Sequence, residues 1–489
     1  MSRPLATLCT LVIGALIAAP TAQGATRLVI KGAGFGHGVG MSQYGAYGFA
    51  LQGRTAAQIL AHYYTGTRIG TLTNDPAVTV LLRSSPAASF TGASRIGERE
   101  LDRGKTYSVL EQGGQVVLRS PTGRALVRFA GPVRATGGAR PVKLLGRGPN
   151  AVRDGLFRGA LEFRPSAGKL LVINAVGLDD YLRGVVPAES PPSWPQAALR
   201  AQAIAARSYA LTNNVGVGQG FSQWADTRSQ VYNGVSAERP STDTAVAATS
   251  RQVVTHLGKT IKAYFFSTSG GKTENVENGF PGASPQPYLK GVEDPYDDES
   301  PRHRWGPYRL TLSQAERKLG GLVKGRLRAI KVTKRGYSPR IVSARIVGSG
   351  GITTVSGPTL RTRFGLFDTW ATFTVIGATV VTPAADEPAA APGPSGGASP
   401  DAGVSRRAAV LSVAPAAPTD AYRKVLTGSV GGAARGQLIR VDRRAGSTWR
   451  TSFWATTRDR AGRFRATLPG PGTYRVAWRG VTGPDVSAP

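Results

Sequence analysis

The pattern of apolar and polar positions predicts a protein built mostly of strands, interrupted by a few helices. Residues 77 to 175 alternate apolar and polar side chains in short runs, with glycine and proline between them, as half-buried strands and turns do. Near residue 195 the pattern changes to the run AALRAQAIAARSYAL, which predicts a helix that Ser193 can cap and Pro195 can begin. Because strands return after this helix without βαβ repeats, we predict an α+β fold that is β-rich with a central helix.

Further elements are predicted on both sides of this helix. Gln52 to Tyr64 has helical spacing, and a second alanine-rich helix is predicted over Asp243 to Ser250. Later strands are predicted from QVVTHLG, KAYFFSTS, RAIKVTKR and ARIVGS. Residues 27 to 70 contain the segment GAGFGHGVGMSQYGAYGFA, whose many glycines permit tight turns and close approach of the backbone.

The two ends of the chain differ from its middle. Residues 1–24 are predicted to be a signal peptide, because Arg3 precedes an apolar run, Leu8 to Ala19, that is too short to span a bilayer; an uncleaved anchor is the alternative. Residues 384–422 are dominated by Ala, Pro, Gly and Ser and are predicted to be a linker. Residues 423–489 return to short alternating strands, which predict a small accessory β-sandwich.

Cysteine content and net charge narrow the expected partners. The single cysteine, Cys9, lies in the predicted signal peptide, so the mature chain would have no disulfide, no thiol nucleophile and no cysteine-ligated zinc. The net charge of +32 favours polyanions. Because a signal peptide directs the chain out of the cell, we expect cell-wall polymers or anionic lipids rather than nucleic acid. A GC-rich genome would also enrich arginine.

One carboxyl group is a candidate for acid–base chemistry. Glu189 lies in the stretch YLRGVVPAESPPSWPQAALRAQAIAARSYAL, Tyr181 to Leu211, where we predict an apolar, proline-rich loop before the helix. Apolar burial would favour the protonated form of Glu189, whereas the nearby helix start would favour its ionised form. The local residues leave two equal alternatives, a catalytic acid and a carboxylate that only stabilises the helix.

Several motifs together resemble the SpoIID/LytB family, named for a sporulation protein and an amidase enhancer. They are the stretch from Tyr181 to Leu211, GLFRGALEF at 155–163, DTRSQVYNG at 226–234, YFFSTSGGKTENVENGF at 264–280, PYLKGVEDPYD at 287–297 and GFGHGVGMSQYGAYG at 34–48. The resemblance implies a SpoIID-like domain over residues 25–383. In the family pattern the glycine-rich segment follows a strand similar to DTWATFTV, here at 368–375, so the chain looks circularly permuted. We therefore predict that residues 27–70 pack against residues 355–377.

The resemblance implies a lytic transglycosylase that cuts peptidoglycan glycan and leaves 1,6-anhydro-muramic ends. Ordinary glycosidases need two carboxyl groups, but here the muramic acid C6 hydroxyl is the nucleophile, so one acid can act first as acid and then as base. Glu189 occupies the position of the family's catalytic acid. The other positions implied to be catalytic are Arg207, Tyr288, Lys290 and Asp297, for which structural ion pairs are the alternative. The glycine-rich segment is expected to bind substrate through His37, Ser42, Gln43 and Tyr44.

Two other functions remain open from the sequence. One is a non-catalytic, peptidoglycan-binding enhancer of a cell-wall amidase, and the other is a basic adhesive surface protein. No cofactor is expected, and no structural zinc, because Arg228 and Ser229 stand where some relatives have zinc ligands. We expect a secreted, cell-wall-associated protein that binds glycan strands and, as an enhancer, an amidase. Nucleic acid is not an expected partner, and membrane contact is expected only through an uncleaved signal peptide.

Overall fold

The computed structural model describes two parts of the chain, which form separate compact units, Met1–Pro383 and Ala384–Pro489. The described residues are 26–216, 218–376, 410–415, 424–429, 438–445, 448–457, 463–468, 472–478, 481–482 and 485–488. The predicted signal peptide, residues 1–24, lies outside them. Within these described ranges, no helix combines the length and the apolar character that a membrane span requires.

The first unit is α+β, as predicted, and the region of alternating residues forms two sheets around one hydrophobic core. The rings of Phe90 and Phe163, one from each sheet, lie 5.3 Å apart in this core. The seven-stranded sheet has, in order, β16 (Gln223–Trp224), β4 (Ala77–Ser85), β15 (Lys169–Gly177), β14 (Ala160–Ser166), β11 (Val133–Thr136), β6 (Arg95–Ile96) and β7 (Arg99–Glu100). The six-stranded sheet has, in order, β10 (Ala125–Phe129), β9 (Gln115–Arg119), β8 (Tyr107–Gln112), β5 (Ala87–Thr91), β12 (Val142–Arg147) and β13 (Arg153–Phe157).

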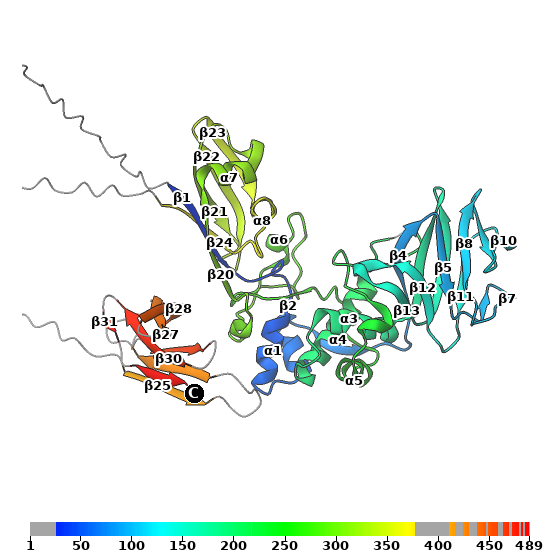
Figure 1. Cartoon of the computed structure of the whole chain (residues 1–489), viewed down its shortest axis with the longest axis horizontal. Helices are drawn as coiled ribbons and strands as arrows, with labels where there is room; N and C mark the ends of the chain where they lie inside the picture. Colours follow the sequence, from blue (N-terminus) through cyan, green and yellow to red (C-terminus); the bar gives the residue numbers. More distant parts are fainter. Residues whose placement is uncertain are drawn as a thin grey trace, which may run out of the picture. The chain divides into compact units, whose positions relative to one another are not determined.

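Three helices, α3 (Leu178–Glu189), α4 (Gln196–Thr212) and α5 (Pro240–Ala248), lie beside these sheets (Figure 1). Helix α4 is the predicted central helix. It contributes Ala203 and Ala206 to the core of the two sheets, and Ala201, Ile204 and Ala205 to a neighbouring core. An alanine-rich sequence suits this position because small side chains let the helix pack closely on both sides.

The structure corrects the prediction for the chain just before α4. Glu189 is not in a loop but is the last residue of α3, which continues through Pro187. Pro187 has no backbone N–H, so α3 loses one hydrogen bond in its last turn and ends two residues later. Ser193 does not cap α4, since Pro195 is the N-cap residue and no side chain caps the helix there.

The glycine-rich segment also forms a helix, which the sequence did not predict. Helix α1 (Gln43–Leu51) begins at Ser42, whose Oγ accepts a hydrogen bond from the Gly45 backbone amide at 3.1 Å. Helix α2 (Ala56–Tyr63) then occupies part of the helix predicted at Gln52 to Tyr64. A Cβ atom at Gly48 would collide with the backbone of Tyr296. Glycine therefore serves close packing in α1, although it lowers helix propensity.

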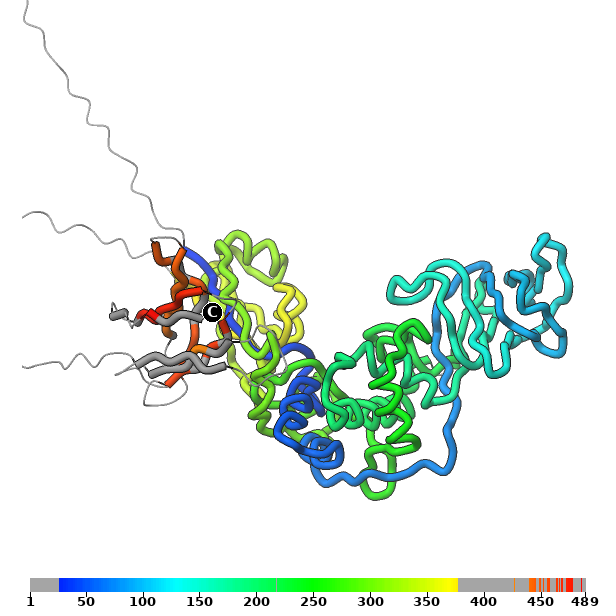
Figure 2. The backbone as a smooth tube through the Cα atoms, turned by 60° about the horizontal axis from the view of Figure 1, so that its bottom comes forward, coloured from blue at the N-terminus to red at the C-terminus, as the bar shows by residue number. Residues whose placement is uncertain are grey.

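The start of the first unit pairs with its end. Strand β1 (Arg27–Ala33) lies between β20 (Arg304–Thr311) and β24 (Ala371–Ile376) and is antiparallel to both, with Arg27 opposite Ile376. Figure 2 shows the blue tube of β1 in the same region as the yellow end of this unit. The prediction that residues 27–70 pack against residues 355–377 is therefore confirmed for these strands.

Smaller elements complete the first unit. The segment after β20 forms α7 (Leu312–Leu319), β21 (Leu327–Arg335), β22 (Ile341–Gly348), β23 (Gly351–Ser356) and α8 (Gly357–Phe364), which share a third core with β1. Near the glycine-rich segment lie β2 (Met41–Ser42), β19 (Phe265–Phe266), β3 (Arg68–Thr71), β17 (Gln252–His256), β18 (Lys259–Thr260) and α6 (Val276–Gly279). The short 3-10 helices are η1 (Pro149–Ala151), η2 (Gly234–Ala237), η3 (Asp297–Glu299) and η4 (Gly320–Leu322).

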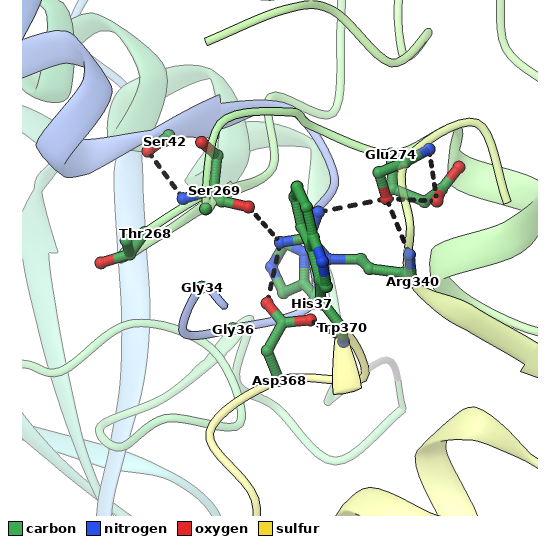
Figure 3. A network of polar contacts seen from close by, with 12 residues as sticks. Gly34, Gly36, His37, Ser42, Thr268, Ser269, Glu274, Arg340, Asp368 and Trp370 are labelled. Carbon is green, nitrogen blue, oxygen red and sulfur yellow. Dashed lines mark hydrogen bonds and ion pairs between the residues drawn. The ribbon is translucent and has the colours of Figure 1, made fainter. Parts of the chain in front are cut away.

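A buried arginine holds the glycine-rich segment in place (Figure 3). The Arg340 guanidinium pairs with the buried carboxylate of Asp368 at 2.8 Å and donates to the carbonyl oxygens of Ser269 and Lys272 at 2.9 and 2.7 Å. The Nε and Cζ atoms of the guanidinium and the adjoining Cδ atom lie so close to Gly38 that a Cβ atom there would collide with them. Both terminal nitrogens of the guanidinium find acceptors, whereas its Nε atom is buried without one. The ion pair with Asp368 and the two carbonyl contacts offset the cost of burying the charge and tie Arg340 to the surrounding backbone.

The second unit consists of two small sheets that share one core. The first has β25 (Val410–Pro415), β26 (Lys424–Ser429) and β29 (Arg463–Thr467), and the second has β28 (Thr448–Thr456), β27 (Leu438–Ala445), β30 (Gly472–Trp478), β31 (Val481–Thr482) and β32 (Val486–Ala488). Strand β25 falls inside the stretch predicted to be linker, residues 384–422. The prediction missed it because the short apolar run VLSVAP stands among Ala- and Pro-rich residues.

The close approach of Arg340 to Gly38 gives a matched test of this packing. Gly38 and Gly53 both have a left-handed backbone, with φ of +86° and +76°, but a Cβ atom at Gly53 would meet nothing within 4 Å. We expect Gly38→Ala to lower the free energy of unfolding by about 1–3 kcal/mol more than Gly53→Ala does, because only the first variant adds an overpacking cost. Urea unfolding followed by intrinsic fluorescence measures both variants. Equal losses would show that Arg340 does not constrain this backbone.

Candidate active site around Glu189

Glu189 lies at a pocket of about 420 Å³ that is lined by segments between Phe35 and Phe280. The lining residues are Phe35, Gly36, His37, Gln43, Glu189, Tyr209, Thr227, Arg228, Ser229, Val231, Tyr264, Phe265, Phe266, Ser267 and Phe280. Among these lining residues Glu189 carries the one carboxyl group. The pocket is therefore an aromatic cavity with a single acid at its wall.

Two hydrogen bonds fix the carboxyl group of Glu189. The Val231 backbone amide donates to its Oε1 atom at 3.1 Å, and the Gln43 side-chain amide donates to its Oε2 atom at 3.3 Å. Burial raises the pKa of Glu189 above its usual value, while these two donors oppose the rise because they stabilise the ionised form. The net effect extends the protonated form toward neutral pH, as a general acid requires.

Gln43 is brought to Glu189 by the start of α1. It is the first residue of that helix and is buried. The Oγ atom of Ser42, the preceding residue, accepts hydrogen bonds from the amides of Gly45 and Ser269 at 3.1 and 3.2 Å. Ser42 therefore anchors the helix start, and its hydroxyl is used in that role rather than in the pocket lining.

His37 is held as a neutral hydrogen-bonded ring. Its Nδ1 atom accepts from the Val39 amide at 3.1 Å, so its Nε2 atom carries the proton and donates to the Phe265 carbonyl at 3.1 Å. Burial, together with the positive charges of Arg340 and Arg361, lowers the pKa of His37 to about 3. His37 thus lines the pocket without charge, and both ring nitrogens are already bonded to the chain.

Aromatic side chains form most of the remaining wall. Tyr209, from α4, packs edge-on against Tyr264 and Phe265 at ring distances of 5.8 and 6.1 Å. Burial raises the pKa of Tyr209 to about 12, and the charge of Glu189 adds to the rise. Tyr209 therefore keeps its phenolic proton at neutral pH and can donate a hydrogen bond inside the pocket.

Arg228 provides the positive charge of the pocket lining. Its guanidinium lies over the Trp224 ring at 3.7 Å and pairs with Asp226 at 2.7 Å. The side chain is 59 % exposed, so it stands at the solvent side of the pocket. Planar stacking on one side and an ion pair on another hold the guanidinium in one orientation.

The structure does not place Arg207 at the pocket. Its side chain is fully buried, and it pairs with Asp179 through two contacts of 2.6 and 3.0 Å and donates to the carbonyl oxygens of Val246 and Gln252. These contacts join the start of α3 to α4, α5 and the first residue of β17. Arg207 therefore supports the helix whose other end carries Glu189.

The three predicted residues of the 287–297 stretch are likewise outside the lining. The Tyr288 ring lies 5.4 Å from the His256 ring, and Lys290 is exposed. Asp297 is buried and accepts from the Gly270 amide at 2.5 Å, and its other oxygen lies 2.6 Å from Nδ1 of His303. The geometry therefore brings together Glu189, Gln43 and His37 at the pocket. Tyr288 and Asp297 have contacts elsewhere, and Lys290 is exposed.

Tyr44 lies near the pocket without lining it. Its ring packs edge-on against Trp194 at 5.1 Å, and Trp194 stacks on Tyr47 at 4.9 Å with an angle of 21° between the rings. Tyr44 was predicted to bind substrate, whereas Trp194 and Tyr47 were not predicted as site residues. Both residues lie inside the family motifs, Trp194 in the stretch from Tyr181 to Leu211 and Tyr47 in the stretch at 34–48. The sequence does not show that these two stretches bring their rings together.

Tyr209 and the aromatic walls were also missed. Tyr209 stands two residues after Arg207 in the predicted helix, on which the sequence does not show which side chains face Glu189. The aromatic run at 264–266 was predicted as a strand and as part of a family motif, but not as a wall of the pocket. Within the described residues, no group of three or more His, Cys, Asp or Glu side chains is arranged to hold a metal ion. The pocket lining, one carboxyl group among aromatic rings, is suited to proton transfer.

Comparison with known proteins places this region in a family. The profile of the SpoIID family, described as Stage II sporulation protein, matches residues 166–256, which include Glu189 and helices α3, α4 and α5. An uncharacterized protein of Brachyspira hyodysenteriae is 39 % identical over 138 residues, which is 28 % of this chain and 37 % of that protein.

Two named proteins of Bacillus subtilis also match. Stage II sporulation protein D is 29 % identical over 210 residues, 40 % of this chain and 59 % of that protein. Amidase enhancer is 36 % identical over 135 residues, 28 % of this chain and 17 % of that protein. Less than two thirds of each relative's length is matched. The segment that carries Glu189, residues 166–256, is thus a SpoIID family domain, as the sequence motifs led us to expect.

Proposed function

We propose that this protein acts on the bacterial cell wall as a lytic transglycosylase, with Glu189 as its acid and base. The observation that carries the proposal is the single carboxyl group in the pocket, with a pKa raised by burial. Both names among the Bacillus relatives, a sporulation protein and an amidase enhancer, support a cell-wall role.

The proposed reaction needs only groups that the pocket and the glycan supply. Protonated Glu189 donates its proton to the glycosidic oxygen as the bond from that oxygen to the anomeric carbon breaks. The C6 hydroxyl oxygen of the muramic acid then bonds to the anomeric carbon, and its proton passes to the Glu189 carboxylate. The products are a 1,6-anhydro end and a free hydroxyl on the leaving sugar. No water is consumed, and Glu189 finishes the cycle protonated.

The neighbours of Glu189 suit both halves of this cycle. The Val231 amide and the Gln43 amide stabilise the carboxylate that exists between the two proton transfers. Neutral His37 and protonated Tyr209 add no negative charge that would compete with Glu189. The aromatic walls favour the apolar faces of a sugar ring and exclude bulk water.

A second function is supported by one specific observation. Four of the positions implied to be catalytic have structural contacts or exposure away from the pocket: Arg207, Tyr288, Lys290 and Asp297. A chain that only binds glycan would not need these side chains in the pocket. In that alternative, Glu189 binds a sugar hydroxyl, and the protein presents glycan to a cell-wall amidase as an enhancer. Secretion by way of residues 1–24 is part of both proposals.

Replacement of the acid tests catalysis. We expect Glu189→Gln to lower the rate of anhydro-end formation from purified peptidoglycan by about 10²–10⁴-fold, because glutamine cannot donate or accept the proton. Mass spectrometry of the products from intact glycan and from glycan without stem peptides measures this rate. Glu100→Gln, at an exposed carboxyl group of β7, is the control and should keep wild-type activity. If the wild-type protein binds both substrates and cleaves neither, the enhancer alternative is favoured.

The hydrogen bond from Gln43 gives a prediction for pH dependence. The acid must be protonated, so kcat/KM falls as the pH rises through the pKa of Glu189. Gln43→Met removes a donor that stabilises the ionised form, which raises that pKa further and moves the fall in activity to higher pH. Gln52→Met, at the exposed other end of α1, should leave the profile unchanged. A shift to lower pH in Gln43→Met would contradict the proposed contact.

A further inference from the structure

We propose that Trp194, Tyr47 and Tyr44 form a sugar-stacking subsite that holds the glycan next to the unit being cut at Glu189. We call these three residues the aromatic platform. The inference rests on the proposed function for its substrate, a polysaccharide chain of pyranose rings. It assigns that chain a second binding position outside the pocket.

The aromatic platform is a compact group of partly exposed rings. The indole of Trp194 stacks on the Tyr47 ring at 4.9 Å, and the Tyr44 ring meets Trp194 edge-on at 5.1 Å and Tyr47 at 6.4 Å. None of the three side chains is buried, although each carries a large apolar surface. The three rings therefore keep part of their apolar surface in contact with solvent.

The geometry of α1 connects the platform to the acid. Gln43, which donates to Glu189, and Tyr47 are four residues apart in this helix and therefore lie on the same face, one turn from each other. One turn advances the helix by about 5.4 Å, which is comparable to the length of one sugar unit in an extended glycan. Trp194 is also close to the acid along the chain, because it comes five residues after Glu189.

The segment that carries Trp194 is held rigidly. The Trp194 amide donates to the Pro191 carbonyl at 3.0 Å, and the Ser241 hydroxyl of α5 donates to the Pro192 carbonyl at 2.7 Å. Proline residues restrict the backbone on both sides of this turn. A site fixed in this way loses little conformational freedom when a ligand binds.

The chemistry of the aromatic platform fits a glycan better than other polymers of the cell wall. One face of a pyranose ring exposes mainly C–H groups, which stack on indole and phenol rings, while its hydroxyl groups stay in water. The three platform residues carry no charge, so an anionic polymer or a lipid headgroup would gain no ion pair from them. The aromatic platform therefore binds a sugar by the shape of its pyranose ring. The pocket beside it positions the glycosidic bond that is cut.

Binding by a protein that cannot cut glycan tests this inference separately from catalysis. In a Glu189→Gln background, we expect Trp194→Leu and Tyr47→Leu each to weaken binding of purified glycan strands by about tenfold, as loss of one stacking contact would. The matched control is Tyr308→Ala, because Tyr308 is also a partly exposed ring (39 %) stacked on a tryptophan, Trp305, but lies on β20. Thermal unfolding of each variant identifies any loss of fold.

A direct spectroscopic readout completes the test. Addition of glycan should change the tryptophan emission of the Glu189→Gln protein, and Trp194→Phe should remove that change while it keeps most of the affinity. Unchanged affinity in both leucine variants would overturn the inference, as would an equal loss in Tyr308→Ala. If Trp194→Leu does not fold, Tyr47→Leu and Trp194→Phe decide the question. Normal platform binding without any cleavage by the wild-type protein would refute the proposed catalysis and leave the subsite intact.

Discussion

The site depends on one constraint, the buried arginine that fixes the glycine-rich segment. Arg340 is enclosed by Asp368 and by backbone carbonyl oxygens, and its side chain leaves no room for a Cβ atom at Gly38. Strand β1 brings this segment to the arginine by pairing with both β20 and β24. His37 and Gln43 lie within this segment. The polar side of the Glu189 pocket is therefore positioned by the contact with Arg340, which is far from Glu189 in sequence.

The same arrangement determines the charges in the pocket. Burial, together with the charges of Arg340 and Arg361, lowers the pKa of His37 and keeps the ring neutral. Burial also raises the pKa of Glu189, which has no second carboxylate beside it in the lining. A retaining or inverting glycosidase would need a second carboxyl group at a defined distance. One protonated acid in an aromatic pocket instead suits a reaction whose nucleophile belongs to the substrate. The segment that matches the SpoIID family, residues 166–256, contains Glu189.

Sequence patterns predicted part of this arrangement and missed the rest for physical reasons. The alternating strands and α4 follow from local periodicity, and Glu189, Gln43 and His37 were named from motifs. Helix α1 was missed because its glycines serve packing against Tyr296 rather than helix propensity. For Arg207 the structure has the ion pair that was the alternative to a catalytic role. Its partner Asp179 could not be predicted, because it lies in another helix and only the folded chain brings the two charges together. Ring clusters such as Trp194 on Tyr47 depend on the same kind of long-range contact.

The central claim is that Glu189 cuts glycan without water, and the source of oxygen in the products tests it most directly. Peptidoglycan would be digested by the wild-type protein in water enriched in heavy oxygen, and the new sugar ends would be analysed by mass spectrometry. The account predicts anhydro ends that carry no heavy oxygen, because the C6 hydroxyl of the substrate closes on the anomeric carbon. New reducing ends labelled with heavy oxygen would contradict it, because water would then be the nucleophile.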